Sequence, residues 1–94
     1  MSICQTYQYN IKLLSYIDQI MKIVNNINHY INFKRMKHNM NDMNNLIKSI
    51  DMINEINIEI RNIKIGITKD KYNQYINILN INISVIKKFI VLFN

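Results

Sequence analysis

Apolar residues recur at alternating intervals of four and three through the last quarter of this chain. The repeat consists of Tyr72, Ile76, Leu79, Ile83, Ile86, Ile90 and Phe93. Such spacing places the apolar residues on one side of an α-helix and forms a seam that packs against another helix. A half-buried strand would instead alternate at every second residue over a shorter stretch. The pattern therefore predicts a long amphipathic helix whose apolar side is covered by other helices.

Two earlier segments carry the same kind of repeat, so we expect helices at about residues 2–37, 42–65 and 70–93. The apolar side of the first is expected to contain Tyr7, Ile11, Leu14, Ile17, Ile20, Val24, Ile27 and Ile31. That of the second contains Leu46, Ile50, Ile53, either Ile56 or Asn57, Ile60 and Ile63. Gly66 stands where a helix C-cap favours glycine, and Thr68 is a candidate N-cap for the third helix.

The length and these repeats predict one all-α domain over residues 1–94. Short connections favour an antiparallel three-helix bundle in up-down-up order, with coiled-coil-like packing. Isoleucines that alternate at residues 56–60 and 63–67 would also suit strands. The helical repeats are much longer, however, and no Asn-Gly or Asp-Gly pair marks a hairpin.

The composition is skewed towards residues with AT-rich codons. The chain has 22 isoleucines and 17 asparagines but no alanine or proline, and it has ten lysines against two arginines. We infer an extremely AT-rich genome. The net charge of +6 is basic enough for an acidic partner. Because the same codon bias enriches lysine, the charge is weak evidence for nucleic-acid binding.

The residues that could take part in catalysis have no partner residues at a spacing typical of a catalytic site. Cys4 is the only cysteine, so neither an internal disulfide nor a cysteine zinc site can form. His29 and His38 have no neighbouring nucleophile or acid in a catalytic arrangement. A single glycine cannot build a phosphate-binding loop. We expect no enzyme activity, no cofactor and no metal.

Three carboxylates, Asp51, Glu55 and Glu59, are spaced by four and fall on one side of the second predicted helix. Carboxylate metal sites in helical bundles also use Glu-x-x-His motifs, which are absent here. We interpret the row as a solvated or salt-bridged surface. The lysines expected nearby are Lys22, Lys87 and Lys88.

The apolar stripes are broader than three helices need, which predicts a protein partner or self-association. The residues proposed to contact that partner flank the main stripes and are Tyr30, Phe33, Ile58, Ile78, Ile81 and Val85. The alternative is a small structural RNA-binding protein that contacts phosphate through Lys34, Arg35 and Lys37. A weaker third possibility is a membrane-surface role for the C-terminal segment, where two lysines precede residues 89–93.

Part of the chain resembles a family of small helical RNA-binding proteins, the fifteenth protein of the bacterial small ribosomal subunit. Residues 15–20 and 27–29 look like part of that family's second helix, and residues 71–81 resemble its last. The resemblance would imply a helical RNA binder over about residues 15–82. The family's Ser-Arg-Arg-Gly turn and strongly basic third helix are missing, so no binding residue is carried over.

The first ten residues do not have the basic start and apolar core of a signal peptide. No stretch approaches the ~20 apolar residues of a transmembrane helix. We therefore expect an intracellular protein of the cytoplasm, an organelle or the interior of a viral factory, and not a secreted one.

Overall fold

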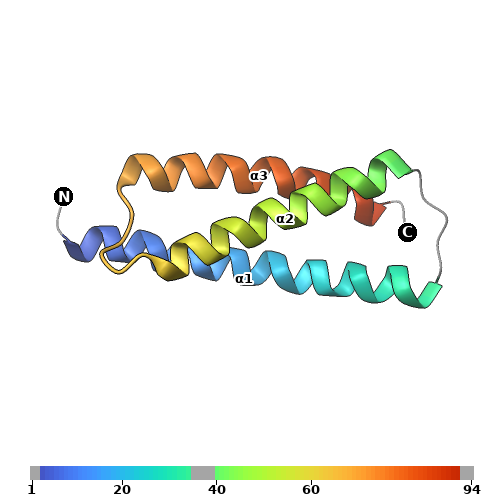
Figure 1. The fold of residues 1–94 in the computed structure, drawn as a ribbon, viewed down its shortest axis with the longest axis horizontal. Helices are drawn as coiled ribbons and strands as arrows, with labels where there is room; N and C mark the ends of the chain where they lie inside the picture. The colour runs from blue at the N-terminus through green and yellow to red at the C-terminus, as the bar shows by residue number, and fades with distance from the viewer. Residues whose placement is uncertain (1–2, 35–39, 92–94) are drawn as a thin grey trace.

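The computed structural model describes the backbone at residues 3–34 and 40–91 and the side chains of residues 5–29 and 41–91. Three helices account for most of this part of the chain: α1 (Ile3–Lys34), α2 (Met40–Asn62) and α3 (Lys69–Val91). Each helix packs against the other two, and the described residues contain no strand. Figure 1 shows α2 crossing obliquely in front of α1 and α3 in an elongated molecule. The prediction of an all-α, three-helix chain is confirmed.

The core runs along the middle of the three helices. α1 buries Leu13, Ile17, Ile20, Val24 and Ile27, and α2 buries Leu46, Ile53, Ile56 and Ile60. Most of these positions were predicted, and the choice between Ile56 and Asn57 is resolved in favour of Ile56. The start of the first stripe was wrong, because Tyr7 and Ile11 are about half exposed. Continuing the buried spacing backwards from Leu13 leads to Asn10, a polar residue that the apolar pattern could not include.

The seam of α3 lies beside the predicted one. Its buried residues are Tyr75, Leu79, Asn82, Ile86 and Phe89, again at intervals of four and three. Four predicted seam residues, Tyr72, Ile76, Ile83 and Ile90, are half-buried and flank this seam. The buried seam contains one polar residue, Asn82, whereas the predicted stripe is apolar throughout. The apolar pattern therefore favoured the predicted stripe.

The connection between α2 and α3 is held against the first turns of α1. The buried Asn10 side chain accepts a 2.9 Å hydrogen bond from the Ile67 amide, and the Thr6 hydroxyl donates one of 3.3 Å to the Ile65 carbonyl. Gly66 has φ of +98°, and a Cβ built there would lie 2.6 Å from the Thr6 carbonyl carbon. Glycine is therefore required both by backbone conformation and by contact with α1.

The ends of the helices differ slightly from the prediction. α2 ends at Asn62, so Gly66 lies within the connection and does not directly cap the helix. Thr68 does act as the N-cap of α3, since its hydroxyl accepts from the Lys71 amide at 3.3 Å and its carbonyl accepts from the Tyr72 amide at 2.9 Å. The extensions predicted for residues 35–37 and 92–93 lie outside the described residues.

Candidate interaction surface

Part of the predicted contact set cannot be placed. Arg35 and Lys37 lie outside the described residues, as do the side chains of Tyr30, Phe33 and Lys34. The RNA-binding cluster and two of the six predicted partner contacts therefore remain predictions.

Three predicted partner residues of α3 form a single stripe. Ile78, Ile81 and Val85 are spaced by three and four and follow the same side of the helix as Asn82. Ile81 is 67% exposed, Ile78 is half-buried against the core, and Val85 is half-buried. The stripe is a second seam next to the buried one, and no described helix covers its centre.

The stripe on α3 adjoins α2. The Asn82 side-chain amide lies 3.8 Å from the Met52 sulfur and also donates to the Ile78 carbonyl at 3.0 Å. Met52 is itself 44% exposed, so it extends the apolar surface onto α2. At the far end a small groove of about 170 Å³ is lined by Val85 and Phe89 of α3 and by residues near the start of α2. We call Met52, Ile78, Ile81 and Val85 the α2–α3 patch.

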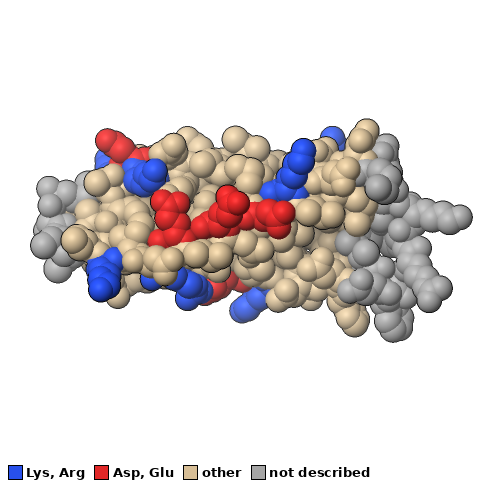
Figure 2. Space-filling model, viewed as in Figure 1, with Lys and Arg blue, Asp and Glu red and all other residues tan. Residues whose placement is uncertain are grey.

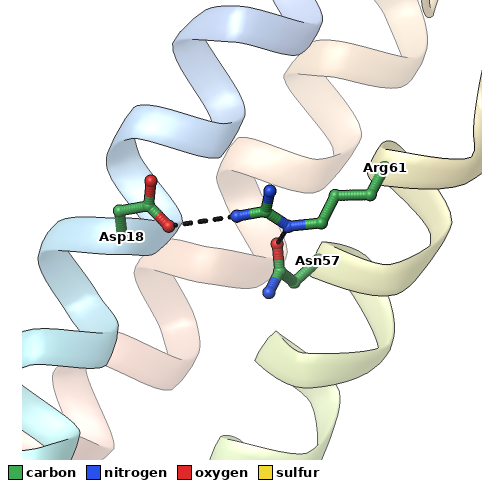
Figure 3. Close-up of polar contacts among 3 residues, drawn as sticks. All are labelled: Asp18, Asn57 and Arg61. Atoms are coloured by element: carbon green, nitrogen blue, oxygen red, sulfur yellow. Dashed lines mark hydrogen bonds and ion pairs between the residues drawn. The ribbon is translucent and has the colours of Figure 1, made fainter.

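The structure separates Ile58 from this patch. Ile58 is 61% exposed, but it lies one helical turn before Arg61, which is directed towards α1. The Arg61 guanidinium contacts the Asp18 carboxylate at 3.3 Å and donates to the Asn57 side-chain oxygen at 2.9 Å (Figure 3). Ile58 therefore lies on the solvent-facing side of α2, between the turn of Glu55 and that of Arg61. In the sequence it was grouped with the α3 residues because, like them, it flanks the main apolar stripe of its helix.

The carboxylates of α2 form a row beside the patch. Asp51, Glu55 and Glu59 are exposed, and Figure 2 shows the acidic side chains of α2 crossing the visible face in a continuous line. None of the three forms an ion pair with a described residue, and the pairing expected with Lys22, Lys87 and Lys88 is absent. Like charges four residues apart destabilise a helix by about 0.2–0.5 kcal/mol per pair. Among the described residues no close ion pair offsets this repulsion.

Glu59 also influences Tyr75 in the buried seam of α3. Burial of the hydroxyl, followed by its interaction with the Glu59 carboxylate, raises the pKa of Tyr75 to about 12. Among the described residues, this hydroxyl is the only buried side-chain nitrogen or oxygen without a hydrogen-bond partner of good geometry. The Lys71 ammonium lies 5.3 Å from the centre of the Tyr75 ring. These contacts place Glu59, the last carboxylate of the row, beside the first two turns of α3.

A second groove, not predicted from the sequence, lies between α1 and α3. It has a volume of about 610 Å³ and is lined by Ile11, Tyr16, Tyr72 and Ile76 among others. The Tyr16 hydroxyl donates to the Asn80 side chain at 2.8 Å and links its two walls. The signal for it in the sequence is Ile11, which the predicted apolar stripe places in the core but which lines this groove and is 52% exposed.

The described side chains do not assemble a cluster of metal ligands. No group of three or more His, Cys, Asp or Glu residues within residues 5–29 and 41–91 is placed to hold a metal ion. His29 lies on α1, whereas the carboxylate row belongs to α2. None of the helices, over their described residues, has the length and apolar character needed to cross a membrane.

Comparison with protein-family models, with curated proteins and with solved structures gives no match. The fold and the surface therefore define the class of protein. It is an all-helical chain of three mutually packed helices with an apolar patch and an acidic row on adjoining helices. The resemblance to the ribosomal family stays a prediction.

Proposed function

We propose that this chain is a non-catalytic interaction module that binds another protein through the α2–α3 patch. The observation that carries the proposal is the exposed second seam on α3, centred on Ile81 and bordered by Met52 and the acidic row. A heptad-spaced apolar stripe on a helix is suited to helix-on-helix packing. Burying such a stripe gains roughly 25 cal/mol per Å² of apolar surface.

An antiparallel, up-down-up arrangement with coiled-coil-like packing is part of this proposal. Three neighbouring pairs support it: Met52 with Asn82, Glu59 with Tyr75, and Asn45 with Phe89. From one pair to the next in order along α2, the α2 residue lies seven positions later in the chain and the α3 residue seven positions earlier, as expected for antiparallel helices. The buried residues of α3 also keep the four-and-three spacing of a coiled-coil seam.

The charge distribution favours a protein partner over nucleic acid at this surface. A row of three carboxylates beside the patch would repel phosphate groups. The basic residues on which RNA binding depends, Lys34, Arg35 and Lys37, belong to the C-terminal end of α1 and the segment that follows it, not to the patch. RNA binding is therefore kept as the alternative only for that segment.

The proposal can be tested by site-specific photo-crosslinking in cells that express the full chain. A photoreactive phenylalanine analogue at position 81 is expected to give a discrete protein adduct. The same analogue at position 58 serves as the matched control, because Ile58 is similarly exposed but lies on the solvent-facing side of α2, outside the patch. Mass spectrometry of the adduct then identifies what was captured.

Two substitutions by an uncharged polar residue test whether binding is lost. Ile81→Asn is expected to abolish the adduct formed by an analogue at position 78, whereas Ile58→Asn leaves it unchanged. Both variants should retain the helical circular dichroism of the natural chain, since both residues are exposed. Equal crosslinking from positions 81 and 58, or none from either, would refute the proposed surface.

A further inference from the structure

We infer that the partner of the α2–α3 patch is an amphipathic helix that carries basic residues along the flank facing α2. The inference rests on the proposed function and adds the charge and the register of the partner. Its basis is that two features lie side by side in this structure. One is an exposed apolar stripe with coiled-coil spacing, and the other is a row of carboxylates that make no close ion pair with a described residue.

The acidic row runs against the composition of the chain. Four of the six Asp and Glu residues lie in α2, although the whole chain has a net charge of +6. From Lys48 to Glu59, one lysine is set against three carboxylates, so this stretch has a net charge of −2. A codon bias that enriches lysine does not account for this local reversal. The row gives one surface of a basic chain a negative potential, which attracts cationic groups.

The apolar side of the site has the spacing that another helix covers. Ile78, Ile81 and Val85 follow one another at intervals of three and four, and Ile81 at their centre is 67% exposed. Met52 of α2 is 44% exposed, so the apolar surface continues from α3 onto α2. The groove of about 170 Å³ beside Val85 and Phe89 offers a place for one apolar side chain of the partner. Such a surface fits the apolar edge of a helix that lies along α2 and α3.

Two contacts between α2 and α3 show where the carboxylates lie relative to the patch. The Asn82 amide lies 3.8 Å from the Met52 sulfur, and the Tyr75 hydroxyl interacts with the Glu59 carboxylate. The path along α2 from Met52 to Glu59 therefore leads from the centre of the patch towards the start of α3, and Glu55 lies between them. At ~1.5 Å per residue, Glu55 and Glu59 are about 4.5 and 10.5 Å beyond Met52 along the helix axis.

The Glu59 end of the row is tied to the buried seam of α3. Tyr75 is 5% exposed, and its buried hydroxyl has no hydrogen-bond partner of good geometry among the described residues. The interaction of this hydroxyl with Glu59 holds the carboxylate beside the start of α3. The Lys71 ammonium lies 5.3 Å from the centre of the Tyr75 ring and makes no close ion pair with Glu59. A cation of the partner would therefore meet a carboxylate that is already positioned.

These levels determine where the partner carries its basic residues. An apolar residue of the partner covers Ile81, and its lysines or arginines come about one and two helical turns further along, opposite Glu55 and Glu59. The basic positions therefore repeat at helical intervals beside the apolar ones, as in the flanks of a coiled-coil helix. Lys48 lies one turn on the other side of Met52, so the partner carries no basic residue at that level.

Two synthetic helical peptides test the charge of the partner on the purified full chain. Each has about three heptads with leucine at the apolar positions, and one flank is lysine in the basic peptide and glutamate in the acidic peptide. Fluorescence anisotropy of the labelled peptides at about 50 mM salt should show the basic one binding about tenfold more tightly, because attractive pairs replace repulsive ones. The net charge of +6 would by itself favour the acidic peptide, so this preference must come from the local surface at the binding site.

Two double variants of equal net charge locate the preference on α2. Glu55→Gln/Glu59→Gln removes two negative charges, and Gln19→Lys/Asn26→Lys adds two positive charges at exposed positions of α1, so each raises the net charge from +6 to +8. The preference for the basic peptide should fall about fivefold or more in the first variant and persist in the second. All four positions are exposed, so both variants should retain helical circular dichroism.

A substitution in the stripe tests the apolar part of the site. Ile81→Asn should weaken binding of the basic peptide by about tenfold or more, since its apolar edge loses the contact at the centre of the patch. Ile58→Asn, the same change at a similarly exposed position outside the patch, should leave the affinity unchanged.

The unfavourable outcomes are distinct from those of the proposed function. The inference is overturned if the basic peptide does not bind at up to about 1 mM, or if the acidic peptide binds equally well. It is also overturned if the preference survives Glu55→Gln/Glu59→Gln, or if it falls equally in Gln19→Lys/Asn26→Lys. A photo-crosslinked adduct at position 81 with a second copy of the chain, or with a segment that has no basic flank, would overturn it and leave the proposed function standing. The proposed function itself fails when position 81 gives no more adduct than position 58.

Discussion

The hydrogen bond between Asn10 and the Ile67 amide gives the sharpest test of how this fold is held together. Asn10 is 3% exposed, and its side-chain oxygen lies 2.9 Å from the Ile67 nitrogen. Replacing Asn10 with alanine leaves a buried amide without an acceptor. Asn25 is an exposed asparagine on the same helix, so Asn25→Ala makes the identical chemical change without that loss.

The comparison of these two variants isolates the buried hydrogen bond. Alanine favours a helix over asparagine by up to about 0.7 kcal/mol, and this gain is common to both. A buried donor that loses its partner costs about 1–3 kcal/mol. Asn10→Ala should therefore be less stable than Asn25→Ala by about 1–3 kcal/mol. For a domain of this size, that difference corresponds to about 5–20 °C in Tm.

Thermal and urea unfolding of both variants, followed by far-ultraviolet circular dichroism, measures the difference. Amide hydrogen exchange adds a local readout, since the Ile67 amide should be protected in the natural chain and should exchange faster in Asn10→Ala. Equal unfolding midpoints for the two variants, with an unchanged Ile67 exchange rate, would refute the view that Asn10 anchors the α2–α3 connection.

Three further outcomes are expected. Gly66→Ala should destabilise the chain by about 1–3 kcal/mol in urea unfolding, because the new Cβ meets the Thr6 backbone and φ is +98°; an unchanged midpoint would contradict this contact. Leu79→Ala should cost about 2–5 kcal/mol by the same assay, since Leu79 is fully buried, and a loss below 1 kcal/mol would argue against the observed seam. The Tyr75 pKa of about 12 lies above its ordinary value of 10.0, so the fold is stabilised while the hydroxyl is protonated. This contribution is complete below pH 10 and is lost as the pH rises from 10 towards 12. The natural chain should therefore lose unfolding free energy more steeply above pH 10 than Tyr75→Phe, and parallel losses would contradict the assignment.

The helices could be predicted from the sequence because their repeats are long. A four-and-three spacing maintained over more than twenty residues outweighs the strand preference of isoleucine. The segment at 56–60, which alternates like a strand, is helical in α2 because its Ile56 and Ile60 also satisfy the helical repeat. The alternating segment at 63–67 forms the connection, where Ile67 is buried against α1.

The positions of the seams could not be predicted equally well. Two seam positions are asparagines, Asn10 and Asn82, and an apolar pattern excludes them by construction. Each makes a hydrogen bond that only the folded chain supplies, either across to the Ile67 amide or within α3 to the Ile78 carbonyl. An uninterrupted apolar repeat therefore follows the neighbouring stripe on α3, and on α1 it passes through Tyr7 instead of Asn10.

The candidate surface comes from a further apolar stripe on α3. Ile78, Ile81 and Val85 lie on the other side of the buried seam from the stripe of Tyr72, Ile76 and Ile83. The buried seam includes Asn82, whereas this further stripe is wholly apolar, with Ile81 exposed and its two neighbours half-buried. A buried polar residue restricts the ways in which a helix can pack, because its hydrogen bonds must be satisfied. Asn82 meets this requirement in the buried seam, because its amide donates to the Ile78 carbonyl of the same helix and lies against the Met52 sulfur. The more apolar seam is left outside, where a protein partner would gain most by covering it.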